Sequence, residues 1–353
     1  MKRYLPALLA LLLTALALAA CGDDDDNTAP TDAAATGTAT ATAKPDKVTF
    51  MAGFKAQANL PFVGVYVAQE KGFFAANGLE VTIQHVNTPG DNYPLLAAGT
   101  VQFSTSDASE LLNKRAGDPP LPIVSIALIG QTGQQGFAVL ADSGIETPAD
   151  WAGKTAGFKG STVTPDYLEI LEANGVDRDS IEEVRVGFEP QVLTEGLVDI
   201  FPVFLSNEPD TLDRLGYPTK VFTAADYGAP TLGLTYTATE DYIAENPDVV
   251  RRFVDAALRG IAYADLHRDE AIDIVMQYAE GADREHQRYM LDTELEMAKK
   301  VVDANSYTFG EQTLDQWQAL HDYQVQYAGI PKALDDVSKA FGDFGIAGID
   351  LNR

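Results

Sequence analysis

Residues 47–84 read KVTFMAGFKAQANLPFVGVYVAQEKGFFAANGLEVTIQ, and this stretch decides the fold. Its first apolar run, Val48–Ala52, predicts a buried strand. Apolar side chains then recur at helical spacing from Pro61 to Phe74, after Asn59, a residue type that caps helices. The next segment, Leu79–Gln84, alternates apolar and polar residues, as a half-buried strand does. A strand, a helix and a second strand in this order are typical of α/β domains.

The same rhythm continues along the chain. We predict further strands at residues 101–103, 122–129, 136–141 and 232–238, and helices at 91–98 and 109–115. Between the last two of these strands lies a block with a complete rhythm of its own. Its predicted strands are 154–158, 183–186 and 220–222, and its predicted helices are 163–173 and 190–197. The remainder is predicted to be helical, starting at Pro247 and continuing at 269–279, 284–303 and 314–327.

The inner block predicts a second lobe that is inserted into the first. We assign residues 47–138 and 236–353 to lobe 1 and residues 139–235 to lobe 2. Both lobes are expected to be doubly wound α/β sheets, and two crossing segments would form a hinge between them. Ligand sites in such sheets lie beyond the carboxyl ends of strands, so the cleft between the lobes is the expected binding site.

The N-terminus has the pattern of a bacterial export signal. Two basic residues precede a Leu/Ala run from Leu5 to Leu18, and Leu-Ala-Ala-Cys ends at Cys21. The pattern resembles a lipoprotein signal, in which residues 1–20 are removed and Cys21 is lipidated. A transmembrane anchor, the alternative, needs about 18 or more apolar residues and leaves Leu-Ala-Ala-Cys unexplained. We therefore expect a lipid-anchored protein on the extracytoplasmic face of the cell membrane.

Composition excludes several classes of function. Residues 21–46 are acidic and rich in Ala and Thr, which predicts a disordered tether. The net charge of -27 would repel phosphate backbones, so we expect no nucleic-acid partner. The chain has one cysteine, and its lipidation would leave no thiol for disulfides or catalysis. The four histidines lack HxH and HExxH spacing, and GxSxG and P-loop motifs are absent, so we expect neither a metal nor a cofactor.

Several motifs resemble those of one protein family. They are PFVGVYVA at 61–68, EKGFF at 70–74, GLEV at 78–81, AGTVQF at 98–103, DWAGK at 150–154 and NEP at 207–209. Together they are similar to the NMT1/THI5-like solute-binding proteins, from about residue 47 to residue 340.

The resemblance implies a type II periplasmic-binding-protein fold and a monomer that hands a small-molecule ligand to an ABC permease. Relatives bind thiamin pyrimidine precursors or riboflavin, and others bind sulfonates. One branch is enzymatic and makes the thiamin pyrimidine with a histidine and a cysteine-rich motif. Because Cys21 is the chain's only cysteine, we expect a binding protein and no enzyme.

Three glutamines, Gln131, Gln134 and Gln135, lie in the loop GQTGQQG at 130–136. An amide offers an acceptor beside donors, the complement of an imide or aminopyrimidine edge, and the glycines allow the backbone to come close to a ligand. A solvated polar turn is the alternative interpretation.

Other candidate ligand-binding residues share aromatic or polar character at expected helix starts and loops. The aromatic candidates, which could stack on a flat ligand or belong to the core, are Phe62, Tyr66, Tyr167 and Tyr227. The polar candidates, which could bind a ligand or cap helices, are Asn59, Asp107, Ser161 and Thr162. Glu208, in the NEP motif, is either a cleft carboxylate or part of a rigid turn.

These residues favour a flat heteroaromatic vitamin as the ligand. Glutamines suit an imide edge, aromatic side chains suit a ring system, and acidic or hydroxyl groups suit a ribityl chain, so riboflavin is the first hypothesis. A thiamin pyrimidine precursor is the alternative. Lys55 and Lys159 are the only basic residues near the candidate motifs, and neither predicts a clamp for a sulfonate or phosphate.

Overall fold

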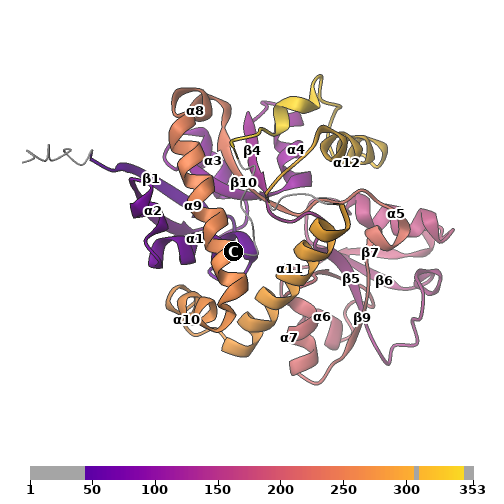
Figure 1. Ribbon diagram of the computed structural model, residues 1–353. Coiled ribbons are helices and arrows are strands. Elements are labelled where there is room, and N and C mark those ends of the chain that lie inside the picture. The colour runs from indigo at the N-terminus through magenta and orange to yellow at the C-terminus, as the bar shows by residue number, and fades with distance from the viewer. Residues whose placement is uncertain (1–43, 306–309, 346–353) are drawn as a thin grey trace, which may run out of the picture. The chain divides into compact units, whose positions relative to one another are not determined.

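The computed structural model describes residues 44–305 and 310–345. Its larger sheet has the strand order β2-β1-β3-β10-β4, and β1, β10 and β4 are labelled in Figure 1. The strands are β1 (Asp46–Ala52), β2 (Leu79–His85), β3 (Phe103–Asp107), β4 (Ile123–Leu128) and β10 (Leu234–Thr239). β1 pairs in parallel with β2 and β3, whereas β10 runs antiparallel to β3 and β4. Every residue of β4 is buried, as its near-continuous apolar sequence predicts.

The inner block forms its own smaller sheets. β5 (Gln135–Leu140) pairs antiparallel with β8 (Phe201–Phe204) and β9 (Thr219–Phe222), and β6 (Thr155–Phe158) pairs in parallel with β7 (Glu182–Arg185). The sequence did not predict β8, which is short and contains Pro202. Proline is tolerated there because β8 lies at the edge of its sheet.

The chain leaves the larger sheet after β4 and returns to it at β10. The two boundaries expected from the sequence, at residues 138 and 235, fall inside β5 and β10. We propose that the lobes divide instead in the connecting segments 129–134 and 223–233.

Helices cover these sheets. They are α1 (Leu60–Glu70), α2 (Phe73–Ala76), α3 (Asn92–Ala97), α4 (Ala108–Ala116), α5 (Pro165–Ala173), α6 (Gln191–Thr194), α7 (Glu208–Arg214), α8 (Glu240–Glu245), α9 (Pro247–Leu266), α10 (Arg268–Tyr278), α11 (Arg284–Asn305) and α12 (Leu314–Gln326). The helix predicted from Pro61 to Phe74 is divided into α1 and α2. The break lies at Gly72, whose φ of 74° belongs to the left-handed region that glycine tolerates.

Phe253 of α9 lies at the centre of the main core. Its ring stacks on those of Phe103 and Phe74, with centroids 3.9 and 5.4 Å apart. The face of α9 predicted from helical periodicity is buried as expected, and it comprises Val250, Phe253, Val254, Ala257, Leu258 and Ile261. This packing holds α9 against both α1 and the larger sheet.

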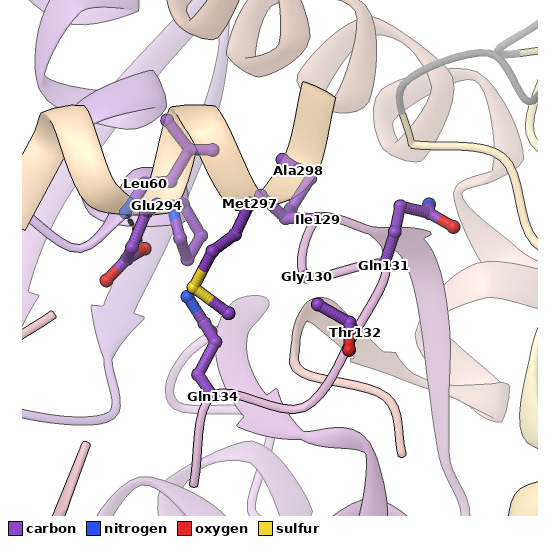
Figure 2. Close-up of a pocket in the computed structure, with 10 residues that line it drawn as sticks. Leu60, Ile129, Gly130, Gln131, Thr132, Gln134, Glu294, Met297 and Ala298 are labelled. Atoms are coloured by element: carbon purple, nitrogen blue, oxygen red, sulfur yellow. Dashed lines mark hydrogen bonds between the residues drawn. The ribbon is translucent and has the colours of Figure 1, made fainter. Parts of the chain in front are cut away.

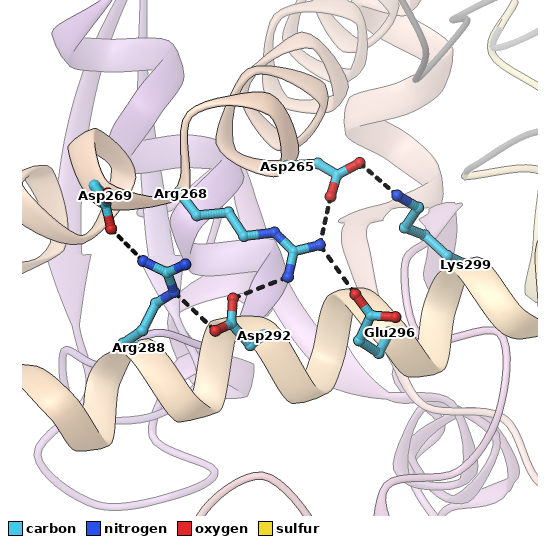
Figure 3. Close-up of polar contacts among 7 residues, drawn as sticks. All are labelled: Asp265, Arg268, Asp269, Arg288, Asp292, Glu296 and Lys299. Carbon is cyan, nitrogen blue, oxygen red and sulfur yellow. Dashed lines mark hydrogen bonds and ion pairs between the residues drawn. The ribbon is translucent and has the colours of Figure 1, made fainter.

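An ion-pair network ties α11 to the corner between α9 and α10 (Figure 3). Arg268 donates to Asp265, Asp292 and Glu296 over 2.8–3.1 Å. Arg288 donates to Asp292 over 2.7 Å and also pairs with Asp269, and Lys299 pairs with Asp265. Single exposed ion pairs contribute little, but a connected network fixes the direction of α11.

The predicted signal peptide, the lipidation site Cys21 and nearly all of the predicted tether lie outside the described residues. Within the part of the chain that is described, no helix combines the length and apolar character needed to cross a membrane.

Candidate functional site

A small cavity forms where the start of α1, the loop after β4 and the middle of α11 meet (Figure 2). The residues that line it are Leu60, Pro61, Ile129, Gly130, Gln131, Thr132, Gln134, Glu294, Met297 and Ala298. Its volume of about 10 Å³ is close to the space that one water molecule needs. An aromatic solute could enter only if the elements that line the cavity moved apart.

Glu294 of α11 is a buried carboxylate at this cavity, and sequence reasoning missed it. Its Oε1 accepts hydrogen bonds from Asn59 Nδ2 at 2.6 Å and from Ser206 Oγ at 2.9 Å. Its Oε2 accepts one from the backbone N–H of Leu60 at 2.6 Å. Glu294 therefore caps α1 from another helix, at the end where the helix dipole favours negative charge.

The pKa of Glu294 is raised above its usual value because the side chain is removed from water. Hydrogen bonds from Leu60, Ser206, Asn59 and Gln134 oppose this shift by stabilising the carboxylate. Burying this carboxylate costs free energy, and the surrounding hydrogen-bond donors offset part of that cost.

Asn59 lies at the position expected for a cap of α1, but its side chain makes no capping hydrogen bond. It accepts from Gln57 Nε2 at 2.6 Å and donates to Glu294. Asn59 thus orients the carboxylate next to the cavity.

The three glutamines of the predicted binding loop are not brought together. Gln134 is buried and lines the cavity, and its Oε1 has no hydrogen-bond partner among the described residues. Gln131 is also buried, but its amide donates to the carbonyls of Leu128 and Glu311 at 3.0 and 2.9 Å. In Figure 2 its side chain points away from Gln134. Gln135 is exposed at the start of β5.

The glycines of this loop serve its packing against the segment before β10. A β-carbon on Gly130 would lie 2.7 Å from the backbone nitrogen of Leu234, and one on Gly133 would lie 2.6 Å from Cβ of Thr231. Gly130 and Gly133 therefore allow two segments of the protein to approach each other, whereas the sequence predicts an approach of the backbone to a ligand.

Glu208 begins α7 and is buried. Its carboxylate accepts from Lys159 Nζ at 2.6 Å and from the backbone N–H of Phe204 at 2.7 Å. This geometry supports the rigid-turn interpretation of the NEP motif, because the carboxylate closes a turn and pairs with a lysine, and Glu208 is not among the residues that line the cavity.

Lys159 also lies over aromatic rings. Its Nζ is 4.7 Å from the ring centroid of Phe201 and 5.3 Å from that of Phe188. Phe188 is 48% exposed, and its ring is 6.0 Å from that of Phe54, in the loop after β1. Phe54 follows β1 of the larger sheet, and Phe188 follows β7 of the inner block. Solvent reaches both rings.

The four aromatic candidates from the sequence belong mainly to the core. Phe62 is buried, and Tyr66 stacks on Tyr278 with centroids 4.2 Å apart. Tyr167 is buried and stacks on Trp151 at 6.0 Å. Tyr227 is half-buried against the core of the inner block. Core packing, the alternative left open for these side chains, is what the structure shows for them.

Helix capping accounts for Asp107, whose carboxylate accepts from the backbone N–H of Ser109 at 2.9 Å and caps α4. The helix expected from residue 163 begins at Pro165, because Thr164 caps it. Ser161 and Thr162 are therefore exposed loop residues that precede the cap, and the prediction that they stand at the helix start is wrong.

Two half-buried carboxyl groups make stability depend on pH. Burial raises the pKa of Asp107 to about 7, with repulsion by Asp166 adding to the shift, and burial raises that of Asp166 to about 6. The folded state therefore keeps protons that the unfolded chain loses near pH 4, so these groups reduce stability as pH rises from about 4 to about 7.

We expect Asp166→Asn to stabilise the protein at pH 8 by about 1–2 kcal/mol and to leave stability at pH 4 nearly unchanged. Asparagine keeps the acceptor for the Tyr323 hydroxyl, now 3.1 Å from Asp166. Urea unfolding at both pH values measures the change, with exposed Asp213→Asn as the control. Equal effects of the two substitutions at pH 8 would refute this account.

The four histidines all make contacts within the fold, since His85 hydrogen-bonds Tyr66 and the ring of His267 packs on that of Tyr263. His286 hydrogen-bonds Asp210 and Asn207 at 2.6 and 3.0 Å, and His321 Nε2 accepts from the backbone N–H of Leu334. Within residues 44–305 and 310–345, no group of three or more His, Cys, Asp or Glu side chains is arranged to hold a metal ion.

Comparison with known proteins identifies the family. The sequence profile described as NMT1/THI5 like matches residues 59–271, which include most of both sets of sheets. The chain belongs to the NMT1/THI5-like family. The resemblance seen in the sequence motifs is thereby confirmed.

Named relatives of this family member include binding proteins. The chain is 28% identical over 272 residues to the formylaminopyrimidine-binding protein of Halalkalibacterium halodurans, covering 74% of this chain and 82% of that protein. It is 29% identical over 294 residues to the riboflavin-binding protein RibY of Chloroflexus aurantiacus, covering 80% and 82%. Synthases of 4-amino-5-hydroxymethyl-2-methylpyrimidine phosphate match at 24–25% identity over 60–64% of this chain.

The fold is that of periplasmic binding proteins, as expected. The periplasmic aliphatic sulphonate binding protein SsuA of Escherichia coli superposes with a TM-score of 0.63 at 14% identity, over 85% of this chain and 92% of that one. At this identity the likeness shows the α/β fold alone.

Proposed function

We propose that this member of the NMT1/THI5-like family is the solute-binding protein of an ABC importer and captures a flat heteroaromatic vitamin or vitamin precursor. The observation that carries the proposal is the cavity at Gln134 and Glu294, where a buried amide oxygen lacks a partner among the described residues. Buried polar atoms normally find partners, and binding sites are common exceptions.

The small volume of this cavity implies movement during binding. The cavity is lined by α1 and α11, and Ser206, in the connection between β8 and α7, donates to Glu294. We propose that these contacts open to admit the solute and re-form around it, and that the permease recognises the closed form. The protein acts as a monomer in this scheme.

Riboflavin and an aminopyrimidine precursor of thiamin are the two candidate solutes. Relatives named for riboflavin and for formylaminopyrimidine match this chain almost equally well. The sequence assigns three glutamines to the imide edge of riboflavin, but the Gln131 amide hydrogen-bonds backbone carbonyls and Gln135 is exposed. The exposed ring of Phe188 and that of Phe54 could still contact a wide ring system.

No chemical step is proposed. The enzymatic alternative, a pyrimidine-synthase-like activity, would consume its substrate, whereas a binding protein returns its solute unchanged. The chain's one cysteine lies at position 21, so a cysteine-rich motif is missing from the sequence.

We also propose that the mature protein begins at a lipidated Cys21 and stays on the extracytoplasmic face of the cell membrane. The Leu-Ala-Ala-Cys motif and the acidic sequence that follows it support this assignment.

The solute can be identified by mass spectrometry of small molecules released when natively purified protein is denatured. We expect riboflavin or an aminopyrimidine in an amount comparable to that of the protein. Release of a sulfonate instead, or of no small molecule by protein that also fails to bind either candidate when it is added, would contradict the proposal.

A further inference from the structure

The amide oxygen of Gln134 accepts no hydrogen bond from the described residues. The side chain is 4% exposed, and its Oε1 is buried without a hydrogen-bond partner in the described part of the chain. Burying a polar atom without a hydrogen-bond partner costs free energy unless a water molecule or a solute supplies the hydrogen bond. The adjacent cavity of about 10 Å³ has room for a water molecule that a solute could displace.

The Glu294 carboxylate favours one orientation of the Gln134 amide. Gln134 and Glu294 both line the cavity, and the Gln134 side chain lowers the pKa of the Glu294 carboxylate, which accepts hydrogen bonds from Leu60, Asn59 and Ser206. A carboxylate attracts the amide NH₂ and repels the amide oxygen. The nitrogen of Gln134 therefore belongs on the Glu294 side, and the reversed amide would place two oxygens together. Figure 2 shows the Gln134 side chain directed toward Met297 and Glu294.

The backbone also holds this side chain in place. The carbonyl oxygen of Gln134 accepts from the N–H of Leu205 at 2.8 Å, at the end of β8. Gly233 lies next to the side chain, and a β-carbon on that glycine would come within 3.1 Å of Gln134 Oε1 and 2.7 Å of the carbonyl oxygen of Thr132. A residue with a side chain at position 233 would thus crowd the free oxygen.

We propose that Gln134 Oε1 accepts a hydrogen bond from a ring N–H or an exocyclic amino group of the solute, and that Glu294 positions the amide for this contact. The inference rests on the proposed function and assigns one specificity-determining residue within that site. It selects solutes that present an N–H donor and disfavours sulfonates, whose oxygens are acceptors only. Riboflavin and an aminopyrimidine both meet the requirement, through N3–H and the amino group.

The test compares solutes that differ only in this donor. Riboflavin is compared with 3-methylriboflavin, and 4-amino-5-hydroxymethyl-2-methylpyrimidine with its 4-dimethylamino derivative, by isothermal titration of the purified protein. We expect the wild type to prefer the solute with the N–H by about 10- to 100-fold, since the methylated solute leaves the amide oxygen unpaired. Butanesulfonate serves as the acceptor-only solute and should bind more weakly than either parent compound.

The variant Gln134→Leu should lower affinity for the N–H solute by about 10-fold or more and nearly abolish the preference over its methylated form. A residue with a purely structural role would weaken both solutes equally. The matched control is Gln135→Leu, in the same loop, whose side chain is exposed at the start of β5 and is not part of the cavity lining. We expect this control to keep the wild-type preference.

The outcomes separate the inference from the proposed function. If the wild type binds a parent solute and Gln134→Leu keeps the full preference, or weakens both solutes equally, the role of Gln134 is wrong and the function stands. If the wild type binds neither riboflavin nor the aminopyrimidine at millimolar concentration, both are wrong.

Discussion

Replacing Gly260 by alanine should destabilise the protein by more than about 3 kcal/mol. Gly260 lies in α9, where that helix crosses α1. A β-carbon at this position would overlap the carbonyl oxygen of Gly64 and lie 3.0 Å from the backbone nitrogen of Ala68. Because these atoms are backbone, no side-chain rotation can relieve the overlap, and the two helices would have to separate. Urea unfolding followed by circular dichroism measures the loss.

The same substitution at Gly187 provides the control. A β-carbon on Gly187 would meet no atom within 4 Å, and its φ is not in the left-handed region. Gly187→Ala should therefore leave stability unchanged or raise it slightly by restricting the unfolded chain. If Gly260→Ala were as stable as Gly187→Ala, the close packing of α1 against α9 would be refuted.

Replacing Glu294 by alanine should cost at least about 3 kcal/mol, because several buried donors would lose their acceptor. The orphaned groups are the N–H of Leu60, the amide of Asn59 and the hydroxyl of Ser206. Solute affinity should fall as well, since the Gln134 amide would lose the carboxylate that orients it. Equilibrium unfolding and titration with riboflavin or the aminopyrimidine measure the two effects.

Two further variants in α11 serve as comparisons for the predicted loss of stability of Glu294→Ala. Glu296→Ala removes an exposed carboxylate that pairs with Arg268 at 3.1 Å, and it should cost less than about 1 kcal/mol. Glu294→Gln keeps the size of the side chain but directs an NH₂ group at donors, so its loss should lie between those of the two alanine variants. A cost below about 1 kcal/mol for Glu294→Ala would exclude the capping role of this residue.

Periodicity in the sequence predicted most of the fold. The alternation of Leu79–Gln84 and the apolar run before Gly130 correspond to β2 and β4, and the apolar face of α9 is buried as predicted. These patterns succeed because one-sided burial imposes a period of two on a strand and 3.6 on a helix.

Polar or short strands were harder to predict. β3 was expected at residues 101–103, but it begins at Phe103 and continues through the buried residues Ser104 and Ser106 to Asp107. The hydroxyl of Ser104 donates to the carbonyl of Met51 at 2.6 Å, so burial costs little. The sequence pattern did not predict β8, because this strand has four residues and contains Pro202. Neither strand has a hydrophobic pattern that reveals it.

The site was predicted less well than the fold, because long-range contacts decide which side chains meet. The loop 130–136 was predicted to bind the ligand through three glutamines, but only Gln134 combines cavity lining with an amide oxygen that lacks a partner among the described residues. Glu294 was missed, although one signal was available. It lies on the same face of α11 as Met290, Leu291 and Ala298, all buried, and an acid on an apolar helix face usually has a specific partner.

The central claim is that this protein binds a flat nitrogen heterocycle reversibly and without changing it. The most direct test is isothermal titration of solute-free protein with riboflavin and with 4-amino-5-hydroxymethyl-2-methylpyrimidine, followed by mass spectrometry of the recovered compound. We predict saturable one-to-one binding of at least one of them at micromolar concentration or below, with the compound recovered intact. The absence of binding at millimolar concentration, or recovery of a chemically altered compound, would contradict the claim.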